Sequence, residues 1–245
     1  MAREVQQLAY VLHRRPYRET SLLVTFLTAE RGKQNAIVRG VRSSSKTARV
    51  KQAWLQPFQS LNVSWSEKPN QQSDLVTLRL LEPAKVRFPL MGEANICGLY
   101  LNELLYRLLY PTIVSESLFH TYQQTLYDLA KAEGRNRQAW ILRQFEFSLL
   151  TELGYGFDLE KDSNGVAICP EGRYVFLPEY GFVEQTTPAA GELEADRCID
   201  GRCLVDFLNQ TYSEACLPSM KRLFRQVLAS HLGDKPIQAR ALFQH

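Results

Sequence analysis

The sequence lacks the features that mark membrane-spanning and exported proteins. No apolar run approaches the roughly 20 residues that span a bilayer, and the first ten residues, MAREVQQLAY, contain no apolar core of a signal peptide. The apolar and charged contents, 45% and 22% of 245 residues, are those of an ordinary globular protein. We therefore expect a cytoplasmic protein with no membrane partner, long enough for one large domain or two smaller ones.

Cysteine and histidine are scarce, and neither is grouped. None of the five cysteines forms a C-x-x-C pair, and the closest spacing is from Cys198 to Cys203. An odd cysteine count without an export signal favours reduced thiols. Cys97 lies in an apolar helical pattern and is expected in the core. The four histidines stand far apart, so the sequence predicts no metal site, with zinc on the other four cysteines a weak alternative.

The motifs of catalysis and nucleotide hydrolysis are also missing. The sequence contains no G-x-S-x-G elbow, no H-E-x-x-H and no G-x-x-x-x-G-K-[ST] phosphate loop. The GYG at 154–156 resembles the start of a dinucleotide fingerprint, but it follows a helical pattern, so helix termination explains it better. The acidic residues of 192–206 follow a loop pattern, which favours solvation over a metal-dependent nuclease. We expect neither an enzyme nor a cofactor.

One segment that is rich in basic residues has no acidic ones. Residues 31–51 include seven Lys and Arg, no Asp or Glu, and three consecutive serines in an expected loop. The first 80 residues carry thirteen basic and five acidic side chains, whereas residues 157–216 carry four and twelve. A solvated charged face is one explanation of such a run. A nucleic acid is the other, because each neutralised phosphate releases counterions.

The two halves of the chain differ in hydrophobic period. Five short strands are expected over residues 5–13, 21–28, 33–41, 59–66 and 75–81. With the basic loop in the middle they fit an OB-fold barrel, although a sandwich or an SH3-like barrel fits nearly as well. Helices are expected over 95–110, 115–134, 136–153 and 219–232, and a strand pair near 174–176 and 181–183. The expected fold class is α+β multidomain, with an N-terminal OB-fold β-barrel over 1–82 and an α-helical C-terminal domain over 83–245 that contains an acidic, irregular insertion around 157–216.

Aromatic residues near the basic run are candidates for stacking on bases, because OB-folds that bind single strands combine a basic groove with aromatic platforms. Tyr17, Trp54, Phe58 and Trp65 are available. Trp65 alternates with aliphatic residues, so we place it in the core. Tyr17 lies in a strongly basic segment. Two roles remain equally open for it, a platform on which bases stack and a structural residue.

Seven groups of short motifs follow one another along the chain in the order of a known family. They are VLHRRPYRETS at 11–21, TAERG at 28–32, RGVRS at 39–43, LQPF at 55–58, GLYLNELL at 98–105, LRQFE at 142–146 with LGYG at 153–156, and LGDKP at 232–236 with RALF at 240–243. In this order they resemble the bacterial DNA repair protein family RecO over nearly the whole chain. Each motif alone is weak, whereas seven in order make a strong resemblance.

The resemblance implies an OB-fold followed by a helical domain, in agreement with the division above. It also implies a recombination mediator that binds single- and double-stranded DNA, anneals complementary strands without ATP, and with RecR helps RecA to displace the single-stranded-DNA-binding protein (SSB). Such a protein would be cytoplasmic and associated with the nucleoid. The residues that we expect to contact DNA are Arg14, Arg15, Arg18, Arg31, Lys33, Arg39, Arg42, Lys46, Arg49 and Lys51.

Two further expectations concern the helical domain. Many RecO proteins carry a four-cysteine zinc module after the tyrosine-glycine helix end, whereas here Cys169 stands alone. The family also binds the acidic, apolar C-terminal tail of SSB. By its place in the 142–146 motif, Arg143 is the expected contact, as an exposed arginine beside an apolar helix face. Without the resemblance, a solvated helix charge is the simpler interpretation of Arg143.

Two other classes of function remain open on the sequence alone. The first is an RNA-binding or ribosome-associated OB-fold protein, which competition between RNA and DNA of one sequence would distinguish, since a site that reads the 2′-hydroxyl prefers RNA. The second is a protein-interaction scaffold whose basic face meets an acidic partner. A scaffold of that kind predicts no binding to bare oligonucleotides at moderate salt.

Overall fold

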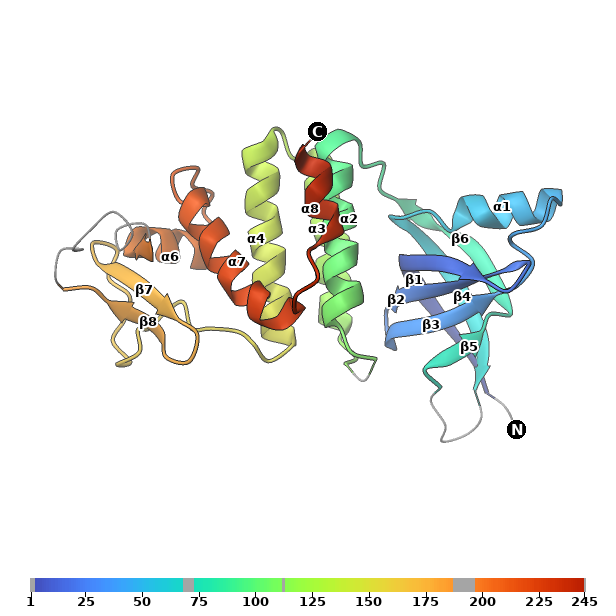
Figure 1. Ribbon diagram of the computed structural model, residues 1–245, viewed down its shortest axis with the longest axis horizontal. Coiled ribbons are helices and arrows are strands. Elements are labelled where there is room, and N and C mark those ends of the chain that lie inside the picture. Colours follow the sequence, from blue (N-terminus) through green and yellow to red (C-terminus); the bar gives the residue numbers. More distant parts are fainter. Residues whose placement is uncertain (1–2, 68–72, 112, 187–196, 245) are drawn as a thin grey trace. The chain divides into compact units, whose positions relative to one another are not determined.

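Six strands near the N-terminus form one sheet in the computed structural model, which describes residues 3–67, 73–111, 113–186 and 197–244 (Figure 1). The sheet has the order β5-β3-β2-β1-β4-β6, and every neighbouring pair is antiparallel except β3 with β5. The strands are β1 (Arg3–Tyr17), β2 (Ser21–Thr28), β3 (Gly32–Val38), β4 (Gln59–Glu67), β5 (Leu75–Thr77) and β6 (Leu80–Arg87).

The two end strands of this sheet, β5 and β6, are consecutive parts of one segment. Between them, the amide of Leu78 donates to the carbonyl of Ile37 in β3 at 3.1 Å, and the amide of Arg79 donates to the carbonyl of Ser64 in β4 at 2.8 Å. The bend therefore joins both ends of the sheet, and β5 with β6 takes the place of the fifth strand of an OB-fold. The expected fold class is confirmed, although the strand predicted over 75–81 is longer and bent.

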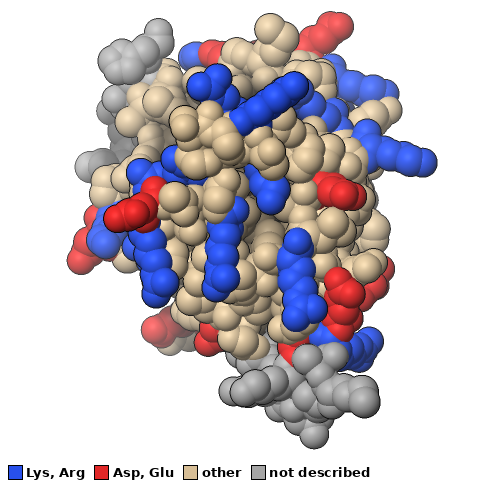
Figure 2. All heavy atoms as spheres, turned by 90° about the vertical axis from the view of Figure 1, so that its right-hand side faces the viewer, with Lys and Arg blue, Asp and Glu red and all other residues tan. Residues whose placement is uncertain are grey.

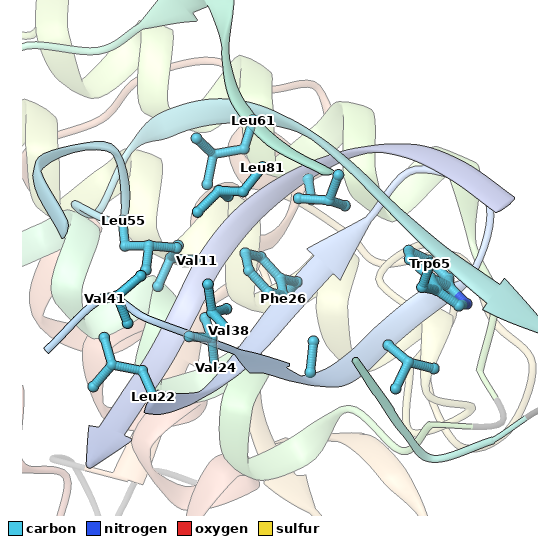
Figure 3. Packing of buried hydrophobic residues seen from close by; sticks show 14 of the residues in the cluster. Val11, Leu22, Val24, Phe26, Val38, Val41, Leu55, Leu61, Trp65 and Leu81 are labelled. Carbon is cyan, nitrogen blue, oxygen red and sulfur yellow. The ribbon is translucent and has the colours of Figure 1, made fainter. Parts of the chain in front are cut away.

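The interior of the barrel is filled by every second residue of its strands, since side chains alternate between the faces of a strand. Figure 3 shows Phe26 in the middle of this cluster, with Leu61 and Leu81 on one side of it and Trp65 on another. Trp65 is 1% exposed and completes the core at one end, as predicted. Full burial of each such side chain contributes about 1.5–3 kcal/mol to the stability of the barrel.

A helix, α1 (Lys46–Trp54), stands where the sequence predicts a loop after the three serines. It begins at Ser45, whose hydroxyl accepts a hydrogen bond from the amide of Ala48 at 3.2 Å. The prediction of an irregular loop was wrong from Lys46 onward, because a serine at the N-cap and good helix formers after it favour a helix. Part of the basic run is therefore carried by a regular element.

By its internal contacts the chain divides into two units, Met1–Ala132 with Pro236–His245, and Glu133–Lys235. The helices α2 (Gly92–Leu108) and α3 (Glu116–Lys131) thus belong with the barrel, as do α8 (Gln238–Ala241) and the 3-10 turn Leu242–Gln244. The Glu103 carboxylate of α2 accepts hydrogen bonds from the amides of Gln238 and Ala239, both at 2.9 Å, and so holds the start of α8. The predicted boundary near residue 82 follows the change of hydrophobic period and stays a prediction.

A buried polar network joins the barrel to α2 and α3. The Asn102 side chain, 3% exposed, donates to the carbonyl of Val11 in β1 at 3.2 Å. Its amide oxygen accepts from the hydroxyl of Tyr122 in α3 at 2.6 Å. Burial raises the pKa of Tyr122 well above its ordinary value, so this hydroxyl remains a donor at neutral pH. The network therefore fixes the two helices against β1.

Replacing Asn102 by alanine is expected to lower the free energy of unfolding by about 3 kcal/mol. The Val11 carbonyl and the Tyr122 hydroxyl would each lose a buried partner, at a cost of about 1–3 kcal/mol per group. Chemical denaturation measures the change. Gln123→Ala is the control, since it removes only a partly buried hydrogen bond to the hydroxyl of Tyr10 and should cost about 1 kcal/mol. Equal losses in the two variants would contradict the role given to Asn102.

The second unit combines helices with a small sheet of order β8-β7-β9. Its elements are α4 (Arg135–Glu152), β7 (Arg173–Leu177), β8 (Gly181–Glu184), β9 (Cys198–Asp200), α6 (Gly201–Leu208) and α7 (Leu217–Leu232). The helices predicted over 136–153 and 219–232 and the strand pair are confirmed, whereas β9 and α6 were not predicted. Part of the acidic stretch of residues 157–216, namely residues 187–196, lies outside the described residues. This part includes Glu192, Glu194 and Asp196.

Two cysteines of this unit form a disulfide. Cys203 in α6 and Cys216, directly before α7, are both buried, with Cα atoms 5.3 Å apart. The prediction of reduced thiols was wrong for this pair. The two residues are 13 apart in the sequence, and only the turn after α6 brings them together, so their spacing did not reveal the bond. Cys97 is buried, as predicted.

Candidate nucleic-acid interface

The outward face of β1, β2, β3 and β5 carries a row of side chains that cross the sheet. Strand pairing places Arg15 opposite Leu23, Leu23 opposite Ile37, and Ile37 opposite Thr77. Leu23 and Ile37 are partly exposed, whereas their sequence neighbours point into the core. The row, which we call the outer row, thus presents an aliphatic centre between an exposed arginine and a threonine. Apolar surface of this kind can contact the face of a base while a basic side chain binds phosphate.

Exposed arginines gather at one end of this face. The Arg42 guanidinium donates to the carbonyl of Arg18 at 2.9 Å. The amides of Val41 and Arg42 also donate to the carbonyl of Thr20, at 2.9 and 3.0 Å. These bonds tie the β1–β2 turn to the segment after β3, so that Arg18 and Arg42, far apart in the sequence, come together. Arg39, also exposed, directly follows β3.

The helix α1 carries a second group of basic residues. Lys46 and Arg49 are exposed and Lys51 is partly exposed. Arg14 is tied to the same helix, since its guanidinium donates to the carbonyl of Leu55, the C-cap of α1, at 2.9 Å. Because α1 packs against β6, its charges extend towards Lys85, which is exposed on that strand.

Lys85, Arg87 and Arg79 are exposed basic residues that the sequence did not single out. All three lie outside the basic run of residues 31–51, and Lys85 and Arg87 also lie beyond residue 81, where the predicted strand ends. Figure 2 shows many Lys and Arg side chains, and fewer Asp and Glu, on the side of the barrel that lies at the right of Figure 1. The charge pattern of the sequence therefore identified only part of the basic surface. Lys85 and Arg87 belong to β6, which is positioned by its pairing with β4.

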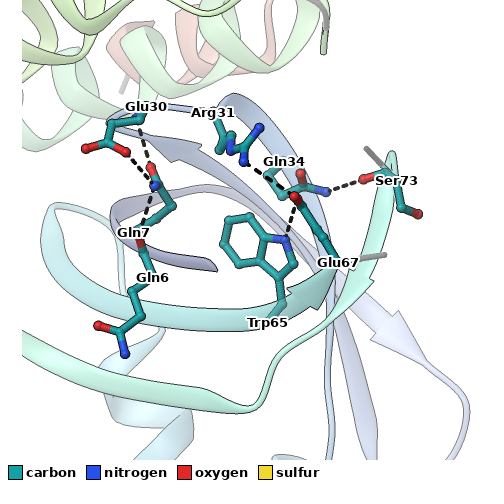
Figure 4. A network of polar contacts seen from close by, with 8 residues as sticks. All are labelled: Gln6, Gln7, Glu30, Arg31, Gln34, Trp65, Glu67 and Ser73. Atoms are coloured by element: carbon teal, nitrogen blue, oxygen red, sulfur yellow. Dashed lines mark hydrogen bonds and ion pairs between the residues drawn. The ribbon is translucent and has the colours of Figure 1, made fainter. Parts of the chain in front are cut away.

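Two of the expected DNA contacts, Arg31 and Lys33, are only partly exposed and are held by groups within the protein. Arg31 forms an ion pair with Glu67 at 3.4 Å, and Glu67 also accepts a hydrogen bond from the indole nitrogen of Trp65 at 2.8 Å (Figure 4). The ammonium group of Lys33 donates to the carbonyl of Tyr106 in α2 at 3.0 Å, and its burial lowers its pKa. Arg31 directly precedes β3 and Lys33 lies at its start, at the opposite end of the strand from Arg39.

Few aromatic rings of the basic region are available for stacking. Trp65 and Phe58 are buried, at 1% and 4% exposure, and Trp54 packs partly buried against the barrel core. Tyr17 is partly exposed at the end of β1, with the Arg18 guanidinium 5.4 Å from the centre of its ring. Of the four aromatic candidates, Tyr17 is the best placed beside the outer row.

A separate basic cluster lies in the second unit. Arg143 of α4 pairs with Glu146, which is fully buried, and the Arg143 side chain is only 11% exposed. The expectation of a well-exposed Arg143 was therefore wrong. Burial lowers the pKa of Lys221 in α7, and the nearby charges of Arg143, Arg135 and Arg225 lower it further. Sequence reasoning singled out only Arg143 of this cluster, because Lys221 and Arg225 belong to α7, which meets α4 only in the fold.

Other kinds of site are not found in the described part of the chain. No three His, Cys, Asp or Glu side chains among the described residues come together as metal ligands would. Among the described helices, none combines the length and the apolar character that crossing a bilayer requires.

Comparison with known proteins gives matches over nearly the whole length. Residues 1–87 match the family model for the N-terminal part of recombination protein O, and residues 91–240 match that for its C-terminal part. The DNA repair protein RecO of Pseudoalteromonas atlantica is 38% identical over 236 residues, covering 96% of this chain and 92% of the relative. That of Pseudomonas paraeruginosa is 39% identical over 240 residues, covering 98% and 94%. That of Tolumonas auensis is 38% identical over 237 residues, covering 96% and 93%.

Proposed function

The chain belongs to the recombination protein O (RecO) family and has a role in recombinational DNA repair, and within that role we propose that it binds single- and double-stranded DNA and anneals complementary strands. The observation that carries this proposal is the group of exposed arginines beside the outer row. It offers phosphate contacts and an apolar surface for bases on one face.

Direct phosphate contacts fall to the exposed residues at the end of the outer row and on α1. These are Arg15, Arg18, Arg39, Arg42, Lys46 and Arg49, together with the partly exposed Lys51. Arg42 donates one hydrogen bond to the carbonyl of Arg18 and keeps further N–H groups for a phosphate. Arg31 and Lys33 are only partly exposed and bind groups within the protein, and Arg14 is tied to the C-cap of α1, so we assign these three to the positive field of the barrel, which attracts DNA at a distance. Lys85 and Arg87 extend the same field along β6.

Annealing by this surface requires no covalent chemistry and no nucleotide. Two complementary strands repel each other, and basic side chains that neutralise their phosphates lower this repulsion. A mainly aliphatic row, with Tyr17 as its nearest ring, holds bases less strongly than a set of aromatic platforms would. The bases of a bound strand therefore remain free to pair. The protein acts in this proposal as a mediator rather than as an enzyme.

The basic cluster of the second unit is proposed to bind the acidic, apolar C-terminal tail of SSB. Glu146 holds the Arg143 guanidinium in place, so little conformational entropy is lost when a carboxylate binds there. Burial lowers the pKa of Lys221, and the positive charges of Arg143, Arg135 and Arg225, which an anionic peptide end would neutralise, lower it further. With RecR as second partner, the protein would then help RecA to replace SSB on single strands.

Removal of charge from this cluster is expected to weaken binding of an acidic peptide that ends in phenylalanine about tenfold. The double variant Arg143→Met with Glu146→Gln removes both charges together, so that no buried carboxylate is left uncompensated. Lys221→Ala tests the same cluster from α7. Fluorescence anisotropy of a labelled peptide measures the affinity.

Arg173→Ala is the matched control for the peptide measurement, since Arg173 is an exposed arginine on the small sheet of the same unit, 48% exposed in its side chain. Peptide affinity that is unchanged in both cluster variants would exclude this cluster as the binding site.

Loading of RecA tests the mediator role as a whole. RecA hydrolyses ATP when it assembles on single-stranded DNA, so its ATPase rate on SSB-coated DNA reports loading. We expect this protein together with RecR to shorten the lag before ATP hydrolysis, and expect the effect to disappear when the SSB tail is deleted. A lag that is the same with and without the protein would exclude the mediator role.

A further inference from the structure

A hollow of about 620 Å³ lies on the barrel beside the outer row. Its size is within the range of roughly 300–1,000 Å³ that is usual for small-molecule sites. The residues that line it come from the ends of β3 and β4 and from the segment of β5 and its bend towards β6. Among them are Arg39, Glu67, Leu75, Thr77, Leu78 and Arg79.

Two arginines contribute to the lining of the hollow from different elements. β3 and β5 are parallel, with Ile37 opposite Thr77. Arg39 lies two residues after Ile37, and Arg79 lies two residues after Thr77, so the two arginines lie on neighbouring segments. Both arginines are exposed. Arg79 was not among the expected DNA contacts. Together the two side chains supply guanidinium groups of the kind that bind a phosphate diester.

The rest of the lining combines apolar and hydrogen-bonding residues. Leu75 is 44% exposed and Leu78 packs against the barrel core, which gives the hollow an aliphatic side. Glu67 is held between Trp65 and Arg31, as Figure 4 shows, so this part of the wall is fixed before any ligand arrives. The hydroxyl groups of Ser73 and Thr77 add hydrogen-bonding partners to the lining, so a base could place its face on the aliphatic side and its polar edge at these groups.

We propose that this hollow binds one unstacked nucleotide of a single DNA strand, with its phosphate at Arg39 and Arg79. The proposal rests on the proposed function and deepens it, because it gives the barrel a way to distinguish single strands from duplex. A base in single-stranded DNA enters the hollow at little cost. In a duplex the same base must first be unpaired and unstacked, which costs free energy. Thr77 belongs both to the outer row and to the hollow, so the strand continues from one to the other.

Two variants test the hollow by different means. Arg79→Ala removes a phosphate contact, and Thr77→Gln places a larger, uncharged side chain in the hollow. Affinities for a single-stranded oligonucleotide and for a duplex of the same sequence are measured by fluorescence anisotropy over a range of salt concentrations. We expect both variants to weaken single-strand binding about fivefold to tenfold and duplex binding less than about twofold. Arg79→Ala should also reduce the salt slope for single strands by about 0.7.

Lys85→Ala is the matched control, since Lys85 is an exposed basic residue of β6 that does not line the hollow. It should change single-strand and duplex affinity by the same small factor. Thermal unfolding of each variant verifies that the barrel is intact, and Arg79→Ala, at an exposed position, keeps the test valid if Thr77→Gln does not fold.

The outcomes separate this inference from the proposed function. If Arg79→Ala weakens single-strand and duplex binding equally, or leaves both unchanged, the hollow does not hold a nucleotide. Binding of DNA by the unaltered protein would then still support the proposed function. If the unaltered protein binds neither form of DNA at moderate salt, the proposed function itself fails.

Discussion

Reversing the charge of three arginines beside the outer row, with Arg15→Glu, Arg39→Glu and Arg42→Glu, is expected to weaken DNA binding about a hundredfold or more at moderate salt. Each of the three is exposed, and each is proposed to contact a phosphate through a charge-assisted hydrogen bond. The loss should be nearly independent of base sequence, because phosphate contacts carry no sequence information. For single strands, the slope of log affinity against log salt concentration should become less negative by about 2, since three phosphate contacts are removed.

A second triple variant, Lys161→Glu, Arg173→Glu and Arg202→Glu, provides the matched control. It makes the same change in net charge at three exposed positions of the second unit. We expect it to lower DNA affinity no more than about threefold, through the long-range field alone. Equal effects of the two triple variants would mean that overall charge, and not the face of the barrel, determines binding.

Gly32→Ala is expected to lower the free energy of unfolding by about 4 kcal/mol. Gly32 starts β3 with a φ of +61°, which is unfavourable for a residue with a Cβ atom. An added Cβ would also clash with the carbonyl oxygen of Ile113, in the segment after α2. Since that atom belongs to the backbone, the clash is relieved only if β3 or this segment moves.

Gly40→Ala separates the two causes. Gly40 has a similar φ of +68°, but an added Cβ there would meet no atom within 4 Å. Only the backbone conformation is then unfavourable, at a cost of about 1 kcal/mol. Chemical denaturation of the two variants gives the comparison. A loss for Gly32→Ala as small as that for Gly40→Ala would show that the contact with Ile113 does not constrain the barrel.

The fold was predictable to the extent that hydrophobic period determines it. Alternation in residues 59–66 identified β4 and the buried Trp65, and the longer period after residue 90 identified α2, α3, α4 and α7. The errors came where local signals compete. Three serines indicated a loop, yet Ser45 is an N-cap and α1 follows it. The length of β6 depends on its pairing with β4, which no local pattern reveals.

The candidate site was less predictable than the fold, because charge in a sequence does not show what each charge contacts. Lys33 and Arg39 belong to the same basic run, but Lys33 binds the carbonyl of Tyr106 whereas Arg39 is exposed. Arg79 lies outside the run and was passed over, although it lines the same hollow as Arg39. Lys221 likewise becomes part of a basic cluster only through the packing of α7 against α4.

Strand annealing on SSB-coated DNA tests the central claim most directly. Two complementary oligonucleotides, each coated with SSB, are mixed, and duplex formation is followed by energy transfer between terminal dyes. We expect this protein to accelerate annealing without any nucleotide. The acceleration should be lost in the variant with Arg15, Arg39 and Arg42 reversed, and lost again when SSB lacks its acidic tail. Annealing at the same rate with and without the protein, while it still binds naked strands, would contradict the account.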